Sequence, residues 1–312
     1  MTISAEIVKT LRERTGAGMM ECKKALLETG GDLDAAAEIM RKAGLAKADK
    51  KAGRIAAEGT IATAMGPDGR TAVLVEVNCE TDFVARQPEF QAFAADVAEA
   101  ALAADSIATE SLSGLKLATG GTVDDTRRSL VAKIGEKIDV RRAGKLAAPD
   151  RIGSYVHGTR IGVLAGLKGG DDALARDIAM HVAAVNPQYV SPADVPADVV
   201  AKEREILAAQ AAAEGKPAAI VEKMVEGRLR KYLAEICLTG QPFVKDPDTT
   251  VGALLARSKA EVSGFLRYEV GEGIEKKREN FAADVQAQIE AAREKDKNRD
   301  KDNGKDRPDP KS

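Results

Sequence analysis

The sequence has very few of the side chains from which metal sites and disulfide frameworks are built. Its 312 residues include two histidines, three cysteines and no tryptophan. Cys22, Cys79 and Cys237 are far apart, odd in number and without CxxC spacing. That pattern disfavours zinc sites and disulfide-stapled folds, and it favours a reducing cytoplasm. We therefore expect no metal site and a cytoplasmic location.

The sequence also lacks the short motifs of nucleotide-binding and hydrolytic enzymes. It contains no GxxxxGK[ST] phosphate loop, no GxSxG nucleophile elbow and no HExxH motif, and residues 166–170 are merely glycine-rich. His181 lies in an apolar helical pattern, which packing explains better than acid–base chemistry. Most carboxylates stand three or four residues from a Lys or Arg, as on solvated helix faces. We predict a protein that is not an enzyme and needs no cofactor.

Neither a membrane nor a nucleic acid is an expected partner. No apolar run approaches the roughly 20 residues that a membrane-spanning helix needs, and the first residues lack the apolar stretch of a signal peptide. The formal net charge is −2, and the slightly basic segments 1–55 and 293–312 contain no aromatic residue for base stacking. A nucleic-acid binder would instead show an affinity that falls steeply with salt.

The hydrophobic core must come from small aliphatic residues, because aromatic residues make up only 3% of the chain. Residues 3–44 show helical spacing in three stretches, which end near Gly16, at Gly30 and Gly31, and before Gly44. The charged run 47–54 (KADKKAGR) is typical of a linker. The pattern predicts a small three-helix domain and linker within 1–55.

From residue 59 the pattern changes from helical to alternating. Residues 59–77 indicate a β-hairpin around a Gly-Pro-Asp-Gly turn, followed by a helix, a further apolar pattern and a strand over 89–104, 123–134 and 138–147. Strands over 154–167, a helix after Asp172 and a strand over 263–270 repeat that order. We predict an α+β fold with two related subdomains, mainly antiparallel, over 56–148 and 149–292.

The second half contains an insertion of strong helix formers. Residues 199–214 and 218–235 flank a Gly-Lys-Pro break, and the second stretch carries an apolar stripe. Two helices joined by so short a turn must lie antiparallel, which predicts a projecting helical hairpin over about 196–236. The last segment, 293–312, has no hydrophobic side chain and is expected to be disordered.

One short segment, which follows the second predicted strand, fits two interpretations. Thr81 or Asp82 suits a helix N-cap, with Phe83 and Val84 packed inward. Alternatively, the segment presents the Asp82 carboxylate and the Phe83 ring together, which is the composition of an interface hot spot. The residues alone favour neither interpretation.

The run NCETDFVA at 78–85 resembles the signature of the elongation factor Ts family. LRERTGAGMMECKKAL at 11–26 resembles the N-terminal signature of that family, which marks a small ubiquitin-associated-type (UBA-like) helical domain. Further matches follow in family order and cover nearly all of 3–280: SYVHGTRIGVL (154–164), IAMHVAA (178–184), EKMVEGRL (222–229), LTGQPFV (238–244) and VGEGIEK (270–276). The charged tail departs from the compact ending of the family.

The resemblance implies guanine-nucleotide exchange on the translational GTPase EF-Tu, without covalent chemistry. It implies that the segment Thr81, Asp82, Phe83 and Val84 enters the nucleotide domain of EF-Tu near its Mg²⁺ site. Phe83 would wedge between helices of the partner, and Asp82 would help displace the segment that organises the metal. The resemblance also assigns contacts with the partner to Arg12, Met19, Met20, Lys23, His157 and Arg160.

Several alternatives stay open at this point. Helix packing is an alternative role for at least one of the two methionines, and turn chemistry for His157. A dimer, or a two-by-two complex with EF-Tu, is compatible with the sequence. An adaptor would bind a partner through residues 1–55 without the core, and an enzyme would show turnover that requires His157 or Asp82. The ordered motifs and the empty catalytic inventory favour the exchange factor.

Overall fold

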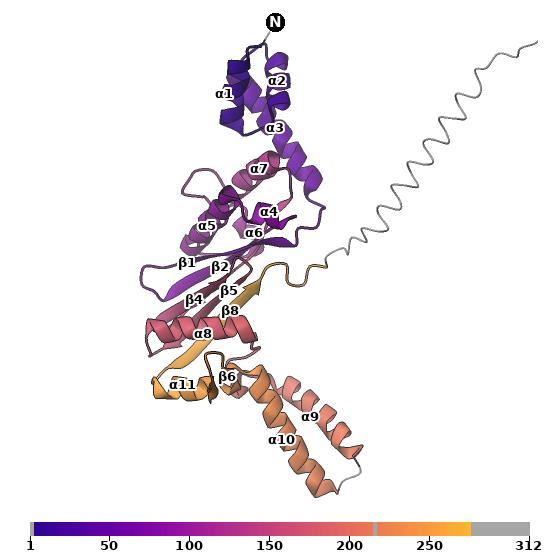
Figure 1. The fold of residues 1–312 in the computed structure, drawn as a ribbon, viewed down its shortest axis with the longest axis vertical. Coiled ribbons are helices and arrows are strands. Elements are labelled where there is room, and N and C mark those ends of the chain that lie inside the picture. The colour runs from indigo at the N-terminus through magenta and orange to yellow at the C-terminus, as the bar shows by residue number, and fades with distance from the viewer. Residues whose placement is uncertain (1–2, 215–216, 276–312) are drawn as a thin grey trace, which may run out of the picture. The chain divides into compact units, whose positions relative to one another are not determined.

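The computed structural model describes residues 3–214 and 217–275, in which helices and small antiparallel sheets alternate along the chain (Figure 1). The predicted α+β class, with N-terminal helices, antiparallel sheets and an inserted helical hairpin, is confirmed. In the described part of the chain no helix is both long and apolar enough to span a membrane. The predicted disordered tail, 293–312, lies outside the described residues, and the division into domains stays a prediction.

The first three helices enclose a small core of their own. They are α1 (Ala5–Thr15), α2 (Met19–Glu28) and α3 (Leu33–Lys51). The Ser4 hydroxyl accepts a hydrogen bond from the Ile7 amide at the start of α1, and Gly16, at a φ of 67°, ends that helix as predicted. The buried side chains of this core include Val8, Leu11, Cys22, Leu26 and Ala36.

Helix α3 is longer than the sequence pattern predicted. Gly44 was expected just past its end, with a linker over 47–54, but α3 continues through Gly44 to Lys51. That prediction was wrong because Ala and Lys favour the helix even in a segment as rich in charged residues as this one. Gly44 has a packing role instead: a Cβ there would lie 2.8 Å from the Cβ of Ala132 on α7 (Val123–Ile134). The glycine lets α3 cross α7 at short range.

The first sheet has the order β1-β2-β3 and is antiparallel throughout. Its strands are β1 (Glu58–Met65), β2 (Thr71–Cys79) and β3 (Ile138–Ala147). Alternate side chains of β2 pack against the helices that follow it, α5 (Pro88–Ala103), α6 (Thr109–Leu112) and α7. The other face of β2 turns toward the second sheet.

The second sheet repeats this order, as the sequence predicted. Its strands are β4 (Arg151–His157), β5 (Ile161–Lys168) and β8 (Glu261–Glu269), paired as β4-β5-β8. The helices α8 (Asp172–Val185) and α11 (Val251–Arg257) cover its outer face. Ile61, Leu74, Ile152 and Leu164 pack between the two sheets, so the layers run helix, sheet, sheet, helix (Figure 1).

A buried carboxylate joins the two sheets. Glu76 of β2 accepts hydrogen bonds from Arg142 Nε at 2.6 Å, Arg141 Nη1 at 3.0 Å and the Gly271 amide at 2.8 Å. Burial by itself would raise the pKa of Glu76, but the hydrogen bonds from the Gly271 amide and Arg142, together with the charge of Arg142, outweigh burial and lower it. The guanidinium of Arg142 also lies 4.2 Å from the centre of the Tyr268 ring on β8.

The inserted helices α9 (Ala197–Ala212) and α10 (Ala218–Ile236) lie side by side and share a core of Leu207, Ala211, Val225 and Leu229 (Figure 1). The chain enters and leaves the hairpin at one place, where the Gln188 amide donates to the Ile236 carbonyl at 2.9 Å. The elements that flank the insertion are two 3-10 turns and a short strand pair: Pro192–Asp194, Leu238–Gly240, β6 (Pro242–Phe243) and β7 (Asp246–Thr250).

His181 is a packed core residue, as the sequence predicted. Its side chain is buried on α8, where Nδ1 accepts a hydrogen bond from the Val244 amide at 3.2 Å. Nε2 must then carry the proton of the neutral ring, and it donates to Gln241 Oε1 at 3.0 Å. Burial lowers the pKa of His181, and the hydrogen bond to Gln241 opposes this only in part.

We expect His181 to make the protein less stable in mild acid. Above pH about 6.5 the His181 ring is neutral in both the folded and the unfolded chain. Below that pH the ring takes up a proton in the unfolded chain but stays neutral in the folded chain, where its pKa is lower. The free energy of unfolding should therefore fall by up to about 1.4 kcal/mol per pH unit, until the folded-state pKa is reached. Urea unfolding at pH 7.5 and 5.5 measures this loss. The His181→Gln variant should lose less stability over that interval, and an equal loss would contradict the assignment.

Candidate functional site

The segment after β2 forms a single turn of helix, α4 (Asp82–Ala85), with Thr81 as its N-cap. The Thr81 hydroxyl accepts a hydrogen bond from the Val84 amide at 3.4 Å. Val84 and Ala85 are buried in the core beneath the first sheet, whereas the Phe83 side chain is 79% exposed. Each of the two interpretations is therefore right in part: Thr81 is the cap and Val84 packs inward, but Phe83 points to solvent.

Asp82 stands beside Phe83 and does not cap the helix. Its carboxylate is half exposed and pairs with Arg86 Nη2 at 3.0 Å, one turn along. Such an exposed pair is weak, because water screens it and two flexible side chains must be held together. The site thus presents a carboxylate and a phenyl ring on consecutive residues, both accessible to a partner.

Two loops hold this turn by exchanging hydrogen bonds between carboxylates and backbone amides. Glu136, in the loop between α7 and β3, accepts from the Thr81 amide at 3.0 Å and from the Thr81 hydroxyl at 2.8 Å. In return, Glu80 accepts from the Lys137 amide at 2.6 Å and pairs with Arg54 at 3.2 Å. The sequence interpretation missed these positioning residues. The structural reason is the strand register: Cys79 pairs with Ile138 at the end of the β2–β3 ladder, so the residues just beyond that pair lie close together.

The thiol next to this turn is not reactive. Cys79 is buried, and its Sγ donates to the Thr81 carbonyl at 3.1 Å. Burial raises the pKa of Cys79 to about 12, and the negative charge of Glu136 adds to the shift. A thiol with such a pKa stays protonated at neutral pH and serves neither as nucleophile nor as metal ligand. Among the described residues no group of three or more His, Cys, Asp or Glu side chains is placed to hold a metal ion.

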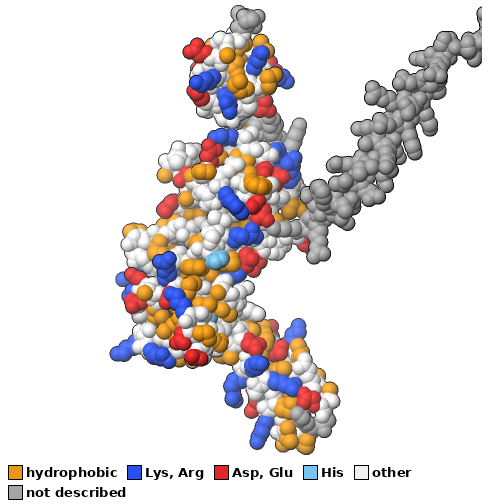
Figure 2. Space-filling view, in the orientation of Figure 1, with side chains coloured by type: hydrophobic (Ala, Val, Ile, Leu, Met, Phe, Trp, Pro, Cys, Tyr) orange, Lys and Arg blue, Asp and Glu red, His pale blue; other side chains and the backbone are white. Residues whose placement is uncertain are grey.

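The predicted contact residues of the N-terminal helices lie on α1 and α2. Met19 and Met20 are 56% and 76% exposed, so the alternative that at least one of them packs inward is contradicted. Leu27, two helical turns after Met20 on α2, is also half exposed, and the sequence pattern does not predict it as a contact residue. Arg12 and Lys23 are exposed on the same two helices, where hydrophobic and charged side chains lie next to one another (Figure 2).

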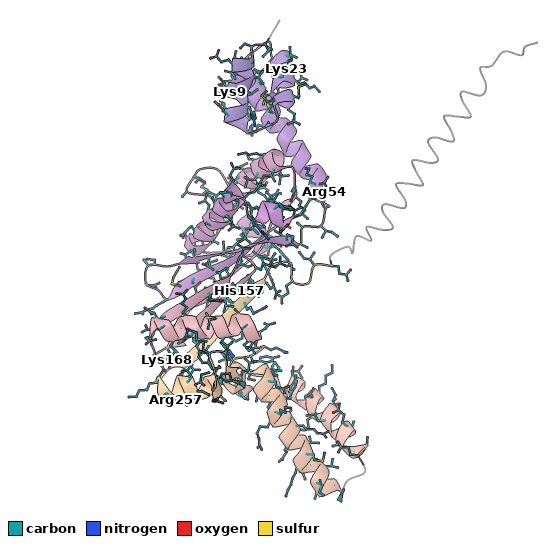
Figure 3. All side chains as sticks on the ribbon, viewed as in Figure 1. Lys9, Lys23, Arg54, His157, Lys168 and Arg257 are labelled. Carbon is teal, nitrogen blue, oxygen red and sulfur yellow. The ribbon has the colours of Figure 1, made fainter. Side chains whose placement is uncertain are left out.

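The remaining predicted contact residues, His157 and Arg160, lie at the two ends of the β4–β5 turn. His157 is exposed at this turn (Figure 3). Its ring stacks loosely on Tyr155, whose hydroxyl lies 3.3 Å from Nδ1. Arg160 pairs with Glu58 Oε2 at 2.6 Å, which ties the turn to β1. The predicted residues therefore occupy three surfaces, on α4, on α1 and α2, and on this turn, rather than one pocket.

Comparison with known proteins identifies the family of this chain. The family model described as Elongation factor TS matches residues 80–272. The chain is 61% identical to the Elongation factor Ts of Methylococcus capsulatus, with 94% of this chain and 100% of that protein covered. It is 58% identical to that of Thioalkalivibrio sulfidiphilus, over 94% of this chain and 100% of the relative, and 56% identical to that of Legionella pneumophila, over 92% and 99%. The chain therefore belongs to the elongation factor Ts family of translation elongation factors.

Proposed function

We propose that this protein binds EF-Tu in its GDP form and promotes GDP release by disturbing the Mg²⁺ and phosphate site, so that GTP can bind. The observation that carries the proposal is the Phe83 ring, 79% exposed on a turn fixed from both sides and next to the Asp82 carboxylate. A protruding apolar ring beside a charge is suited to enter a partner, and no covalent chemistry is needed.

The mechanism follows from how a GTPase holds GDP. Backbone amides cradle the phosphates, and Mg²⁺ neutralises their charge. Phe83 wedges between helices of EF-Tu, and Asp82 displaces the segment that organises the metal. Packed elements move in discrete steps, so a small displacement disrupts the cradle and leaves the phosphate charge poorly compensated.

Burial of the Phe83 ring alone does not supply the free energy that nucleotide exchange requires. If bound GDP and the exchange factor each weaken the other's affinity by about a thousandfold, the coupling free energy is about 4 kcal/mol, and it is reciprocal. Burial of one phenylalanine contributes roughly 1.5–3 kcal/mol. The other two surfaces must therefore hold EF-Tu while Phe83 acts, through Arg12, Met19, Met20 and Lys23 on α1 and α2 and through His157 and Arg160 at the β4–β5 turn. We infer that this complex forms in the cytoplasm, with either one or two copies of each protein.

The direct test is release of fluorescent GDP from purified EF-Tu, followed by stopped flow with this protein at catalytic amounts. We expect a large acceleration that saturates with EF-Tu concentration and needs neither a cofactor nor turnover of a covalent intermediate. An unchanged release rate, with folded protein and an EF-Tu from the same source, would refute the exchange function.

A further inference from the structure

The α4 turn cannot hold its own conformation. It spans only Asp82–Ala85, and an isolated helical turn fixes several dihedral angles for one hydrogen bond. Val84 and Ala85 anchor its inner side in the core, but the exposed Phe83 ring has little intramolecular packing to orient it. The direction of Phe83 and Asp82 must therefore come from the backbone at the start of the turn.

The Glu136 carboxylate holds that backbone at the capping residue. A threonine hydroxyl has one proton to donate and lone pairs to accept. Because Glu136 Oε1 takes the proton at 2.8 Å, a lone pair of the Thr81 hydroxyl is left facing the Val84 amide as the cap. Glu136 Oε2 also accepts a hydrogen bond from the Thr81 amide at 3.0 Å, so one carboxylate holds both the backbone and the side chain of the capping residue.

We propose that Glu136 is a positioning residue for nucleotide exchange, which presents Asp82 and Phe83 in their working orientation before EF-Tu arrives. This inference rests on the proposed exchange function. A turn that is already ordered loses less conformational entropy when Phe83 contacts EF-Tu. Loss of Glu136 should therefore weaken the action of Phe83, although Glu136 acts only through Thr81.

The Glu136→Ala variant should lower kcat/KM for GDP release by roughly tenfold, because the Thr81 hydroxyl is then no longer held in its capping orientation and a lost cap costs about that factor. Hydrogen–deuterium exchange over residues 79–87, measured without EF-Tu, should become faster in this variant. Glu136→Gln keeps one acceptor and should lie between Glu136→Ala and the wild type. Glu110→Ala, which removes an exposed carboxylate from α6, is the matched control and should change neither quantity.

A double-mutant cycle separates positioning from direct contact. In a background that carries both Asp82→Ala and Phe83→Ala, Glu136→Ala should have almost no further effect on kcat/KM, since both side chains that Glu136 orients are gone. If the two effects multiply independently, or if hydrogen exchange over 79–87 is unchanged in Glu136→Ala, the positioning role is wrong. If wild-type protein fails to accelerate GDP release, the exchange function fails first, and the hydrogen-exchange result still reports whether Glu136 orders the turn.

Discussion

Replacing Phe83 with alanine is expected to slow GDP release from EF-Tu by about ten- to a hundredfold, with a smaller loss of affinity for the nucleotide-free partner. The estimate follows from the roughly 1.5–3 kcal/mol that burial of a phenyl ring contributes, at about 1.4 kcal/mol per tenfold. The affinity should fall less than the rate, because α1, α2 and the β4–β5 turn supply most of the holding contacts. Stopped-flow release of fluorescent GDP and titration against nucleotide-free EF-Tu measure the two quantities.

The controls for Phe83→Ala follow from the structure. The melting temperature should stay unchanged, because a ring that is 79% exposed contributes little to the core. Ile220, 48% exposed on α10, offers a matched apolar truncation away from the α4 turn, and Ile220→Ala should leave the exchange rate unaltered. Release at the wild-type rate by Phe83→Ala would show that the ring is not a wedge.

Replacing Gly153 with alanine is expected to destabilise the fold by about 3 kcal/mol or more, the upper range for an overpacked core. A Cβ on Gly153 of β4 would lie 2.1 Å from the backbone carbon and oxygen of Ala175 on α8. Backbone cannot move aside as a flexible side chain can, so α8 would have to separate from the second sheet. The melting temperature should fall by at least roughly 6 °C in calorimetry.

The matched control for this substitution is another strand glycine of the same sheet. A Cβ on Gly264 of β8 would meet only the Leu146 Cδ1, at 3.8 Å, which is an ordinary contact. Gly264→Ala should therefore change the stability by less than about 1 kcal/mol. Equal melting temperatures for Gly153→Ala and the wild type would mean that β4 and α8 are not packed as closely as described.

The sequence predicted the order of elements well because the pattern of the chain is local. Strand alternation, the turn before Thr71 and the helix stop at Gly16 each depend on neighbouring residues, and all three appear in the structure. The sequence also identifies the candidate segment, but it does not decide between the two interpretations. Local propensity cannot tell that Val84 faces a core and Phe83 faces solvent, since both residues are equally apolar.

What the sequence did not predict depends on contacts between distant residues. Glu136 acts on Thr81 across 55 residues, and such a carboxylate has the same local pattern as a solvated one. Gly44 was interpreted as a helix end, because the close approach of Ala132 cannot be inferred from residues near it. Glu76 sits at a strand position where a hydrophobic residue would be typical, and the hydrogen bonds that it accepts from the two arginines of β3, the Gly271 amide and Asn78 explain it.

The way the chain enters and leaves the α9–α10 hairpin has a consequence for engineering. Residues 188–190 and 236–239 are joined by backbone hydrogen bonds, so the ends of the insertion are neighbours whatever lies between them. Since the hairpin also carries its own core, its length is decoupled from the register of both sheets. This position is the natural point in the fold for a graft or a deletion: a short loop, a reporter or a hairpin of different length can bridge the same two ends.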